Sequence, residues 1–121
     1  MQLYKPNKLK ATGEYGGLVL KATDKFGIFK LKPGEFLLPG AHEEEETFYI
    51  VKRKLTVIAS EYQEKLIAEK GDILSIPPGQ THTSTNRGEE EVVVFWCLSA
   101  ATCSGQETSM GEVSSGKIRV E

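Results

Sequence analysis

Short apolar segments bounded by turn-forming residues recur along the whole chain. They lie at residues 16–23, 26–32, 47–60, 64–70, 72–77 and 91–100, with a last short one at 117–121. Apolar and polar side chains alternate in most of them, and glycine, proline, aspartate, asparagine or short charged turns separate them. This spacing is typical of an antiparallel sandwich or barrel, and no window predicts a long helix. The pattern therefore predicts an all-β fold.

Two parts of this pattern carry finer predictions. Residues 51–72 have the pattern of a hairpin, in which Leu55, Val57 and Ala59 share one face. In residues 91–100 both sets of alternating positions are apolar, so this strand is expected to be buried on both sides. One side would face the interior and the other a second sheet or another subunit. We interpret this as a sign of homodimerisation.

The chain length predicts one domain, because 121 residues can bury a single core and are too few for two. The strand pattern places that core at about residues 16–100. Residues 101–116 are rich in Ser, Gly, Thr and Ala, which bury little apolar area, so we expect this tail to be flexible. Residues 117–121 could return to the sheet or add to a partner's edge, and so short a segment does not decide between them.

Composition narrows the classes of partner. Charged residues make up 26% of the chain, hydrophobic residues 39%, and the formal net charge is -2. Such a chain has no basic surface for a phosphate backbone, so nucleic acid is not an expected partner. No apolar run approaches the roughly 20 residues of a membrane span, and the start has no signal peptide, which predicts a cytoplasmic protein without a membrane partner.

An acidic run with one histidine leads into an apolar segment. If the chain is extended through this run, His42, Glu44 and Glu46 point to the same side as Phe48. Phe48 belongs in a core, so the three polar side chains would line the mouth of the interior. The alternative is a solvated acidic loop, since runs of like charge are usually exposed.

A second histidine follows a rigid turn. A short apolar strand ends at Pro77 and Pro78, because proline lacks the amide that continues a ladder. His82 lies just past this turn, where it is ordered by the fold yet open to a cleft. It could also be a surface histidine that is only hydrogen-bonded. With His42 and Glu46 it would complete the two-histidine, one-carboxylate arrangement of non-haem iron(II) and of catalytic zinc sites.

These residues resemble the motifs of the cupin superfamily. The second cupin motif has fixed positions at Gly71, Pro77, Gly79, His82 and Asn86, and the chain matches every one of them. The match is specific, because the turn needs Pro77 and Gly79 but does not need a histidine.

The first cupin motif is matched only in part. Gly34, His42 and Glu46 fit it, with His42 at the place of the second histidine. Gly40 stands where the family has another histidine, and Arg53 stands where it has a closing glycine. One of the usual ligands is therefore missing, and the first motif is degenerate.

The resemblance implies a small single-domain cupin, whose fold is the jelly-roll barrel or double-stranded β-helix. By position it implies a divalent metal ion, Fe, Mn, Ni or Zn, held by His42, Glu46 and His82. In an extended chain Glu44 points to the same side as His42 and Glu46, so it could replace the missing ligand. A carboxylate there would favour a harder ion such as Mn²⁺ or Fe²⁺. Glu44 is also the candidate for proton transfer, since a carboxylate near an apolar mouth tends to have a raised pKa.

The same parity assigns Phe48 and Trp96 to the wall of a substrate pocket, although simple core packing would place them equally well. The resulting hypothesis is a metal-dependent enzyme on a small organic substrate, of dioxygenase, lyase or isomerase type. The alternative is a non-catalytic module that binds a small molecule and has a weak or empty metal site, which the departures at Gly40 and Arg53 favour. A purely structural dimerisation unit is the weakest hypothesis, because folding alone does not require His82.

Overall fold

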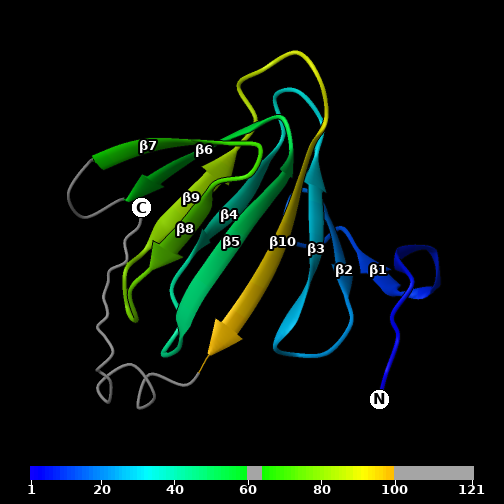
Figure 1. The fold of residues 1–121 in the computed structure, drawn as a ribbon. Coiled ribbons are helices and arrows are strands. Elements are labelled where there is room, and N and C mark those ends of the chain that lie inside the picture. The colour runs from blue at the N-terminus through cyan, green and yellow to red at the C-terminus, as the bar shows by residue number, and fades with distance from the viewer. Residues whose placement is uncertain (60–63, 100–121) are drawn as a thin grey trace.

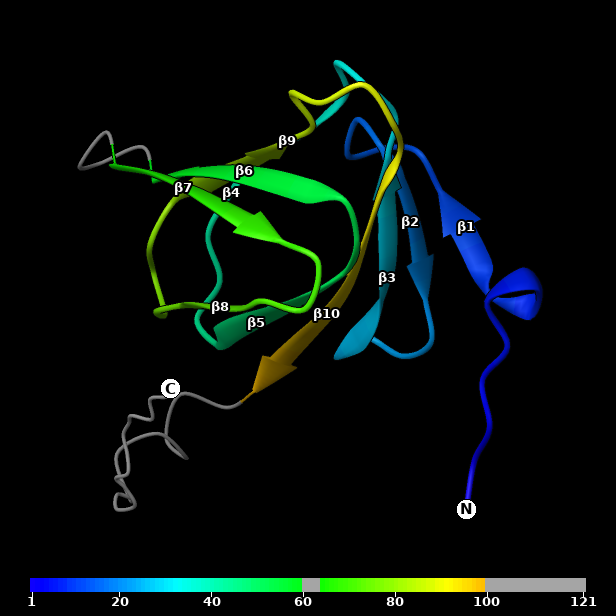
Figure 2. The same cartoon turned by 45° about the horizontal axis from the view of Figure 1, so that its top comes forward.

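The computed structural model describes residues 1–59 and 64–99, which form two antiparallel sheets that face each other (Figure 1). In Figure 2 the two sheets are seen as opposite walls around a common interior. The larger sheet has, in spatial order, β1 (Lys10–Thr12), β2 (Leu18–Lys21), β3 (Phe26–Leu31), β10 (Val92–Ser99), β5 (Glu45–Lys52) and β8 (Ile73–Ile76). The smaller sheet has β4 (Phe36–Gly40), β9 (His82–Thr85), β6 (Lys54–Ala59) and β7 (Glu64–Glu69). The predicted all-β fold is confirmed.

The core fills the space between the sheets. Phe29 and Phe48 meet edge to face with their ring centres 5.3 Å apart. The other buried side chains of this core come from both sheets and include Val19, Leu31, Ile50, Leu55, Val57, Ile76, Val92 and Val94. Burying them supplies the main stabilisation of so small a barrel.

The predicted hairpin is confirmed. Leu55 pairs with Ala68 and Val57 pairs with Leu66 across β6 and β7, and Leu55, Val57 and Ala59 are buried on the inner face. The turn of this hairpin, at residues 60–63, lies outside the described residues.

The apolar segment predicted at residues 47–60 is two strands that belong to different sheets. Arg53 separates β5 from β6 and has a φ angle of 68°, a left-handed conformation that glycine adopts most readily. Arg53 therefore has the backbone expected of the family's closing glycine. Its guanidinium forms an ion pair with Glu90.

Three strands, β1, β4 and β9, were not predicted from the sequence. β4 contains Pro39 and Gly40, which is tolerated because this strand lies at the edge of the smaller sheet. β9 has polar residues on its buried face, His82 and Ser84, so it shows no apolar alternation. The segment containing His82, expected to be a loop after a turn, begins a strand.

Within one chain only the inner face of β10 is buried, so burial of its outer face would need another subunit and stays a prediction. Val94 is fully buried on the inner face, whereas Phe95 on the outer face is 37% exposed and Cys97 is partly exposed. Homodimerisation remains a prediction. The predicted flexible tail at residues 101–116 and the possible strand at 117–121 lie outside the described residues. Within the described part, no helix has the length and apolar character needed to cross a membrane.

Candidate metal centre

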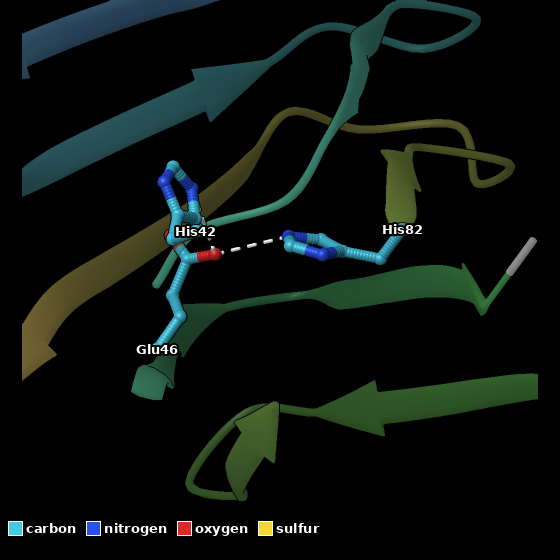
Figure 3. A group of neighbouring side chains, drawn as sticks. All are labelled: His42, Glu46 and His82. Carbon is cyan, nitrogen blue, oxygen red and sulfur yellow. Dashed lines mark hydrogen bonds and ion pairs between the residues drawn. The ribbon is translucent and has the colours of Figure 1, made fainter. Parts of the chain in front are cut away.

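Three side chains converge at one end of the interior from three separate segments (Figure 3). Glu46 lies near the start of β5, His82 is the first residue of β9, and His42 lies in the link between β4 and β5. Figure 3 shows the imidazole of His82 directed at the carboxylate of Glu46, with His42 on the other side of that carboxylate. The fold thus brings together the three residues that the sequence singled out.

The turn after β8 connects the two motifs. Gly79 has a φ angle of 80°, and its backbone N–H donates a 2.7 Å hydrogen bond to the carbonyl oxygen of His42. A residue with a side chain would be strained at this φ, which explains the glycine. The second motif therefore holds the His42 segment at a fixed distance from His82.

The candidate ligand atoms of these residues lie close enough together that they could hold a metal ion. Glu46 Oε1 lies 2.9 Å from His82 Nε2 and 3.6 Å from His42 Nε2. All three ligand atoms lie within 4.8 Å of one another. Atoms about 2.1 Å from a common ion are separated by roughly 3 to 3.5 Å, so a small movement of His42 would complete the set. Two imidazoles and a carboxylate also suit the divalent transition metals chemically.

A second contact orients the ring of His82. Its Nδ1 lies 2.9 Å from the carbonyl oxygen of Gln80, which can only accept, so Nδ1 carries a hydrogen and donates. This arrangement leaves Nε2 as the ring atom that faces Glu46. A hydrogen bond to the distal ring nitrogen is the usual way in which proteins fix a histidine ligand.

The electrostatics of His82 favour a proton at Nε2 in the metal-free protein. Burial lowers the pKa of this imidazole, but the hydrogen bonds to Glu46 and Gln80 and the charge of Glu46 outweigh that effect. The pKa of His82 is therefore raised above its ordinary value. Because a metal would bind at the same atom, proton and metal compete for Nε2.

A cavity of about 380 Å³ opens beside the three residues. Most of its wall is apolar and is formed by Val19, Phe29, Leu37, Phe48, Trp96 and Leu98. Phe48 and Trp96 thus lie where the pocket hypothesis placed them, and Phe48 also packs in the core. The indole Nε1 of Trp96 is buried and has no hydrogen-bond partner in the described part of the chain. The volume falls within the range of small-molecule sites.

Glu44 does not join this group, so the parity argument for it is wrong. The chain bends at Glu43 and Glu44 before β5 begins, which breaks the assumed alternation. The carboxylate of Glu44 instead lies 2.6 Å from the ammonium of Lys25. The hydrogen bond from Lys25 is the main reason why the pKa of Glu44 is lowered, where the sequence argument expected a raised pKa.

Gly40, at the place of the missing ligand, lies directly beside the centre. It is the register partner of His82 across β4 and β9, and it lines the cavity. A Cβ atom at Gly40 would meet no atom within 4 Å. The place of the missing ligand is therefore open space rather than a site filled by another side chain.

Sequence reasoning missed Lys21, which also lines the cavity. The signal was present in the alternation of β2, because Lys21 has the same parity as the core residue Val19.

Comparisons with known proteins agree with this geometry. The family model described as Cupin_2, cupin domain, matches residues 27–98, which is more than half of the chain. No match to a curated protein sequence was found.

Solved structures share the fold at low sequence identity. The polyketide cyclase RemF from Streptomyces resistomycificus superposes with a TM-score of 0.65 at 18% identity, over 81% of this chain and 79% of that one. A predicted oxalate decarboxylase from Thermotoga maritima has a TM-score of 0.65 at 19% identity, over 80% and 97%. CENP-C of Drosophila melanogaster bound to CAL1 has a TM-score of 0.69 at 15% identity, over 80% and 85%. The predicted double-stranded β-helix is confirmed.

Proposed function

The chain belongs to the cupin domain family, and from this premise we propose that it is a metal-dependent enzyme acting on a small organic molecule. The observation that carries the proposal is the convergence of His42, Glu46 and His82 beside an apolar cavity. Three protein ligands leave coordination positions for a substrate or water, as catalytic metal sites do. The open space beside Gly40 adds room at the same place.

The chain's own residues would bind the ion, orient the substrate and exclude water. His42, Glu46 and His82 would hold a divalent ion such as Fe, Mn, Ni or Zn, which supplies Lewis acidity to an oxygen of the substrate. The apolar wall, including Phe48 and Trp96, would exclude water and strengthen polar interactions within the cavity. Dioxygenase, lyase and isomerase chemistry are all compatible with such a site.

Elemental analysis of the protein, purified without an affinity tag or chelator, tests the metal centre. We expect near-stoichiometric metal in the wild type and none in His82→Ala. That result would justify a screen of organic acids, ketones and diketones with and without O₂. Absence of metal from both proteins, even after incubation with each ion, would sink the proposed metal centre.

A binding module is the second candidate function, and two observations favour it. Gly40 leaves the centre with three protein ligands, which weakens an ion's hold. The CENP-C structure, which contains bound CAL1, has the same fold. In this case the cavity would bind a small molecule without turning it over, and a metal-free protein would still bind its ligand.

We also propose that two copies pair through the outer face of the larger sheet. Ile28, Phe95, Tyr49 and Ile73 are register neighbours on β3, β10, β5 and β8, so they form one apolar row across four strands. Exposure increases along it, from partly buried Ile28 to 37% at Phe95, 43% at Tyr49 and 71% at Ile73. Sedimentation velocity should show a dimer that Phe95→Glu separates, and a wild-type monomer at all concentrations would contradict the pairing.

A further inference from the structure

A lysine points into the barrel at the boundary between the apolar core and the cavity. Lys21 is the last residue of β2, on the same inward face as Val19, which is buried in the core. Lys21 is partly buried and lines the cavity that the metal centre opens on. A charged side chain is costly at an inward position unless something compensates its charge.

No ion pair within the described residues gives that compensation. No carboxylate lies within ion-pair distance of Lys21, whereas Lys25 in the next turn is paired with Glu44. The Lys21 ammonium lies over the ring of Tyr15, 5.9 Å from Nζ to the ring centre. This distance is at the limit of a cation–π contact, and no protein group in the described residues accepts a hydrogen bond from the ammonium, which leaves it free to bind an anion.

The floor of the cavity connects Lys21 to the metal centre. Lys21, Gly27, Trp96 and Phe48 are successive register neighbours on β2, β3, β10 and β5. Gly27 has no side chain, and a Cβ atom there would lie 3.0 Å from Cζ2 of Trp96. The indole therefore covers β3 and separates Lys21 from Phe48 by a flat apolar surface.

We propose that Lys21 binds the carboxylate of an organic acid whose opposite end carries the oxygen atoms that meet the metal. This inference rests on the proposed metal centre and names the substrate class. Strands lie about 4.8 Å apart, so β2 and β5 are separated by roughly 14 Å, and a lysine side chain spans nearly half of that distance. A flat body about one aromatic ring long fills the remainder, above Trp96 and Phe48.

Size and charge agree with this ligand. A cavity of about 150 Å³ holds benzene, so 380 Å³ holds a substituted aromatic acid with space to spare. With a divalent ion bound, the positive charges of the ion and Lys21 exceed the negative charges of Glu46 and Asp24 in the lining. The loaded cavity therefore attracts an anion.

Calorimetric titration of the zinc-loaded protein tests the assignment without turnover, because zinc is not redox-active. The probes are protocatechuate, which has two adjacent hydroxyls opposite a carboxylate, and its methyl ester, which keeps the hydroxyls and lacks the charge. We expect protocatechuate to bind roughly tenfold more tightly than the ester, as a charge-assisted hydrogen bond in a partly buried site allows. Lys21→Met should abolish this preference, and Lys21→Arg should retain most of it.

Lys30→Met is the matched control, since it removes the same charge from the outer face of β3 and should leave the preference unchanged. Equal affinities for the two probes in the wild type, binding of neither, or a preference that survives Lys21→Met would overturn the role of Lys21. Zinc content, measured before each titration, separates the two proposals. A protein that takes up no zinc contradicts the metal centre itself, and a loaded protein without the preference contradicts only the ligand class.

Discussion

The two ends of β9 carry buried polar side chains with different roles. His82 begins the strand and Asn86 directly follows it, and they are 8% and 1% exposed. The amide of Asn86 donates to the carbonyl oxygens of Leu31 and Glu90 at 2.9 and 2.8 Å, and accepts from the N–H of Gly88 at 2.8 Å. His82 instead meets a carboxylate beside an open cavity.

The difference shows that burial and hydrogen bonding do not by themselves identify a functional residue. Asn86 uses its hydrogen-bonding groups on backbone atoms and joins three chain segments, which is a structural role. His82 has one ring nitrogen on a backbone carbonyl and the other on a group that can itself bind a metal. What distinguishes the proposed functional side chain is a partner that can itself bind a metal, together with adjacent free space.

The largest expected effect is a difference in the unfolding free energy lost on substitution at the two ends of β9. Asn86→Ala should lower the free energy of unfolding by about 3 kcal/mol, because it leaves buried backbone groups without partners. His82→Ala should cost no more than about 1 kcal/mol, since water can enter the adjoining cavity and solvate Glu46. Urea unfolding of the metal-free proteins measures both changes. Equal losses would mean that His82 is as structural as Asn86.

The next effect depends on pH and should occur only at the His82 end. The pKa of His82 is raised above its ordinary 6.5, so the protonated pair with Glu46 stabilises the metal-free fold below that pH. This contribution is lost as pH rises through the raised pKa. Metal binding has the opposite sign and should weaken at least tenfold for each pH unit below the raised pKa, because at least the proton of His82 is displaced. Zinc titrations between pH 5 and 8, run at roughly unit steps, measure the slope; a flat profile would show that no proton leaves His82.

A third substitution adds a histidine ligand beside His82. Gly40→His should tighten metal binding by about tenfold or more, because Gly40 is the cross-strand partner of His82 and its Cβ position is free. Competition with a chelator of known affinity measures the gain. Gly40→Ala is the control, since it adds the Cβ without a ligand. No difference between the two variants would mean that water already serves that position as well as an imidazole.

Much of this site could be predicted because two kinds of regularity pointed to it. The alternation of apolar and polar residues predicted most strands, and the fixed spacing around Gly79 and His82 pointed to the candidate metal-binding group. The rest depended on local geometry that sequence patterns do not record. β9 was missed because its inward side chains are polar. The boundary between β5 and β6 at Arg53 was missed because an arginine gives no sign in the sequence of a positive φ angle. The bend at Glu44 reversed a parity argument that holds only for extended chain.

That bend gives the last prediction, a substitution that should change almost nothing. Glu44→Gln removes a carboxylate only two residues from Glu46, yet Glu44 pairs with exposed Lys25 and stays outside the metal-binding group. Exposed ion pairs contribute little to stability, so unfolding and zinc affinity should both match the wild type. Glu46→Gln is the matched variant, and it should lose zinc because an amide binds the ion far less well than a carboxylate. If Glu44→Gln also loses zinc, the link before β5 must rearrange when metal binds, and Glu44 would then supply the ligand that Gly40 lacks.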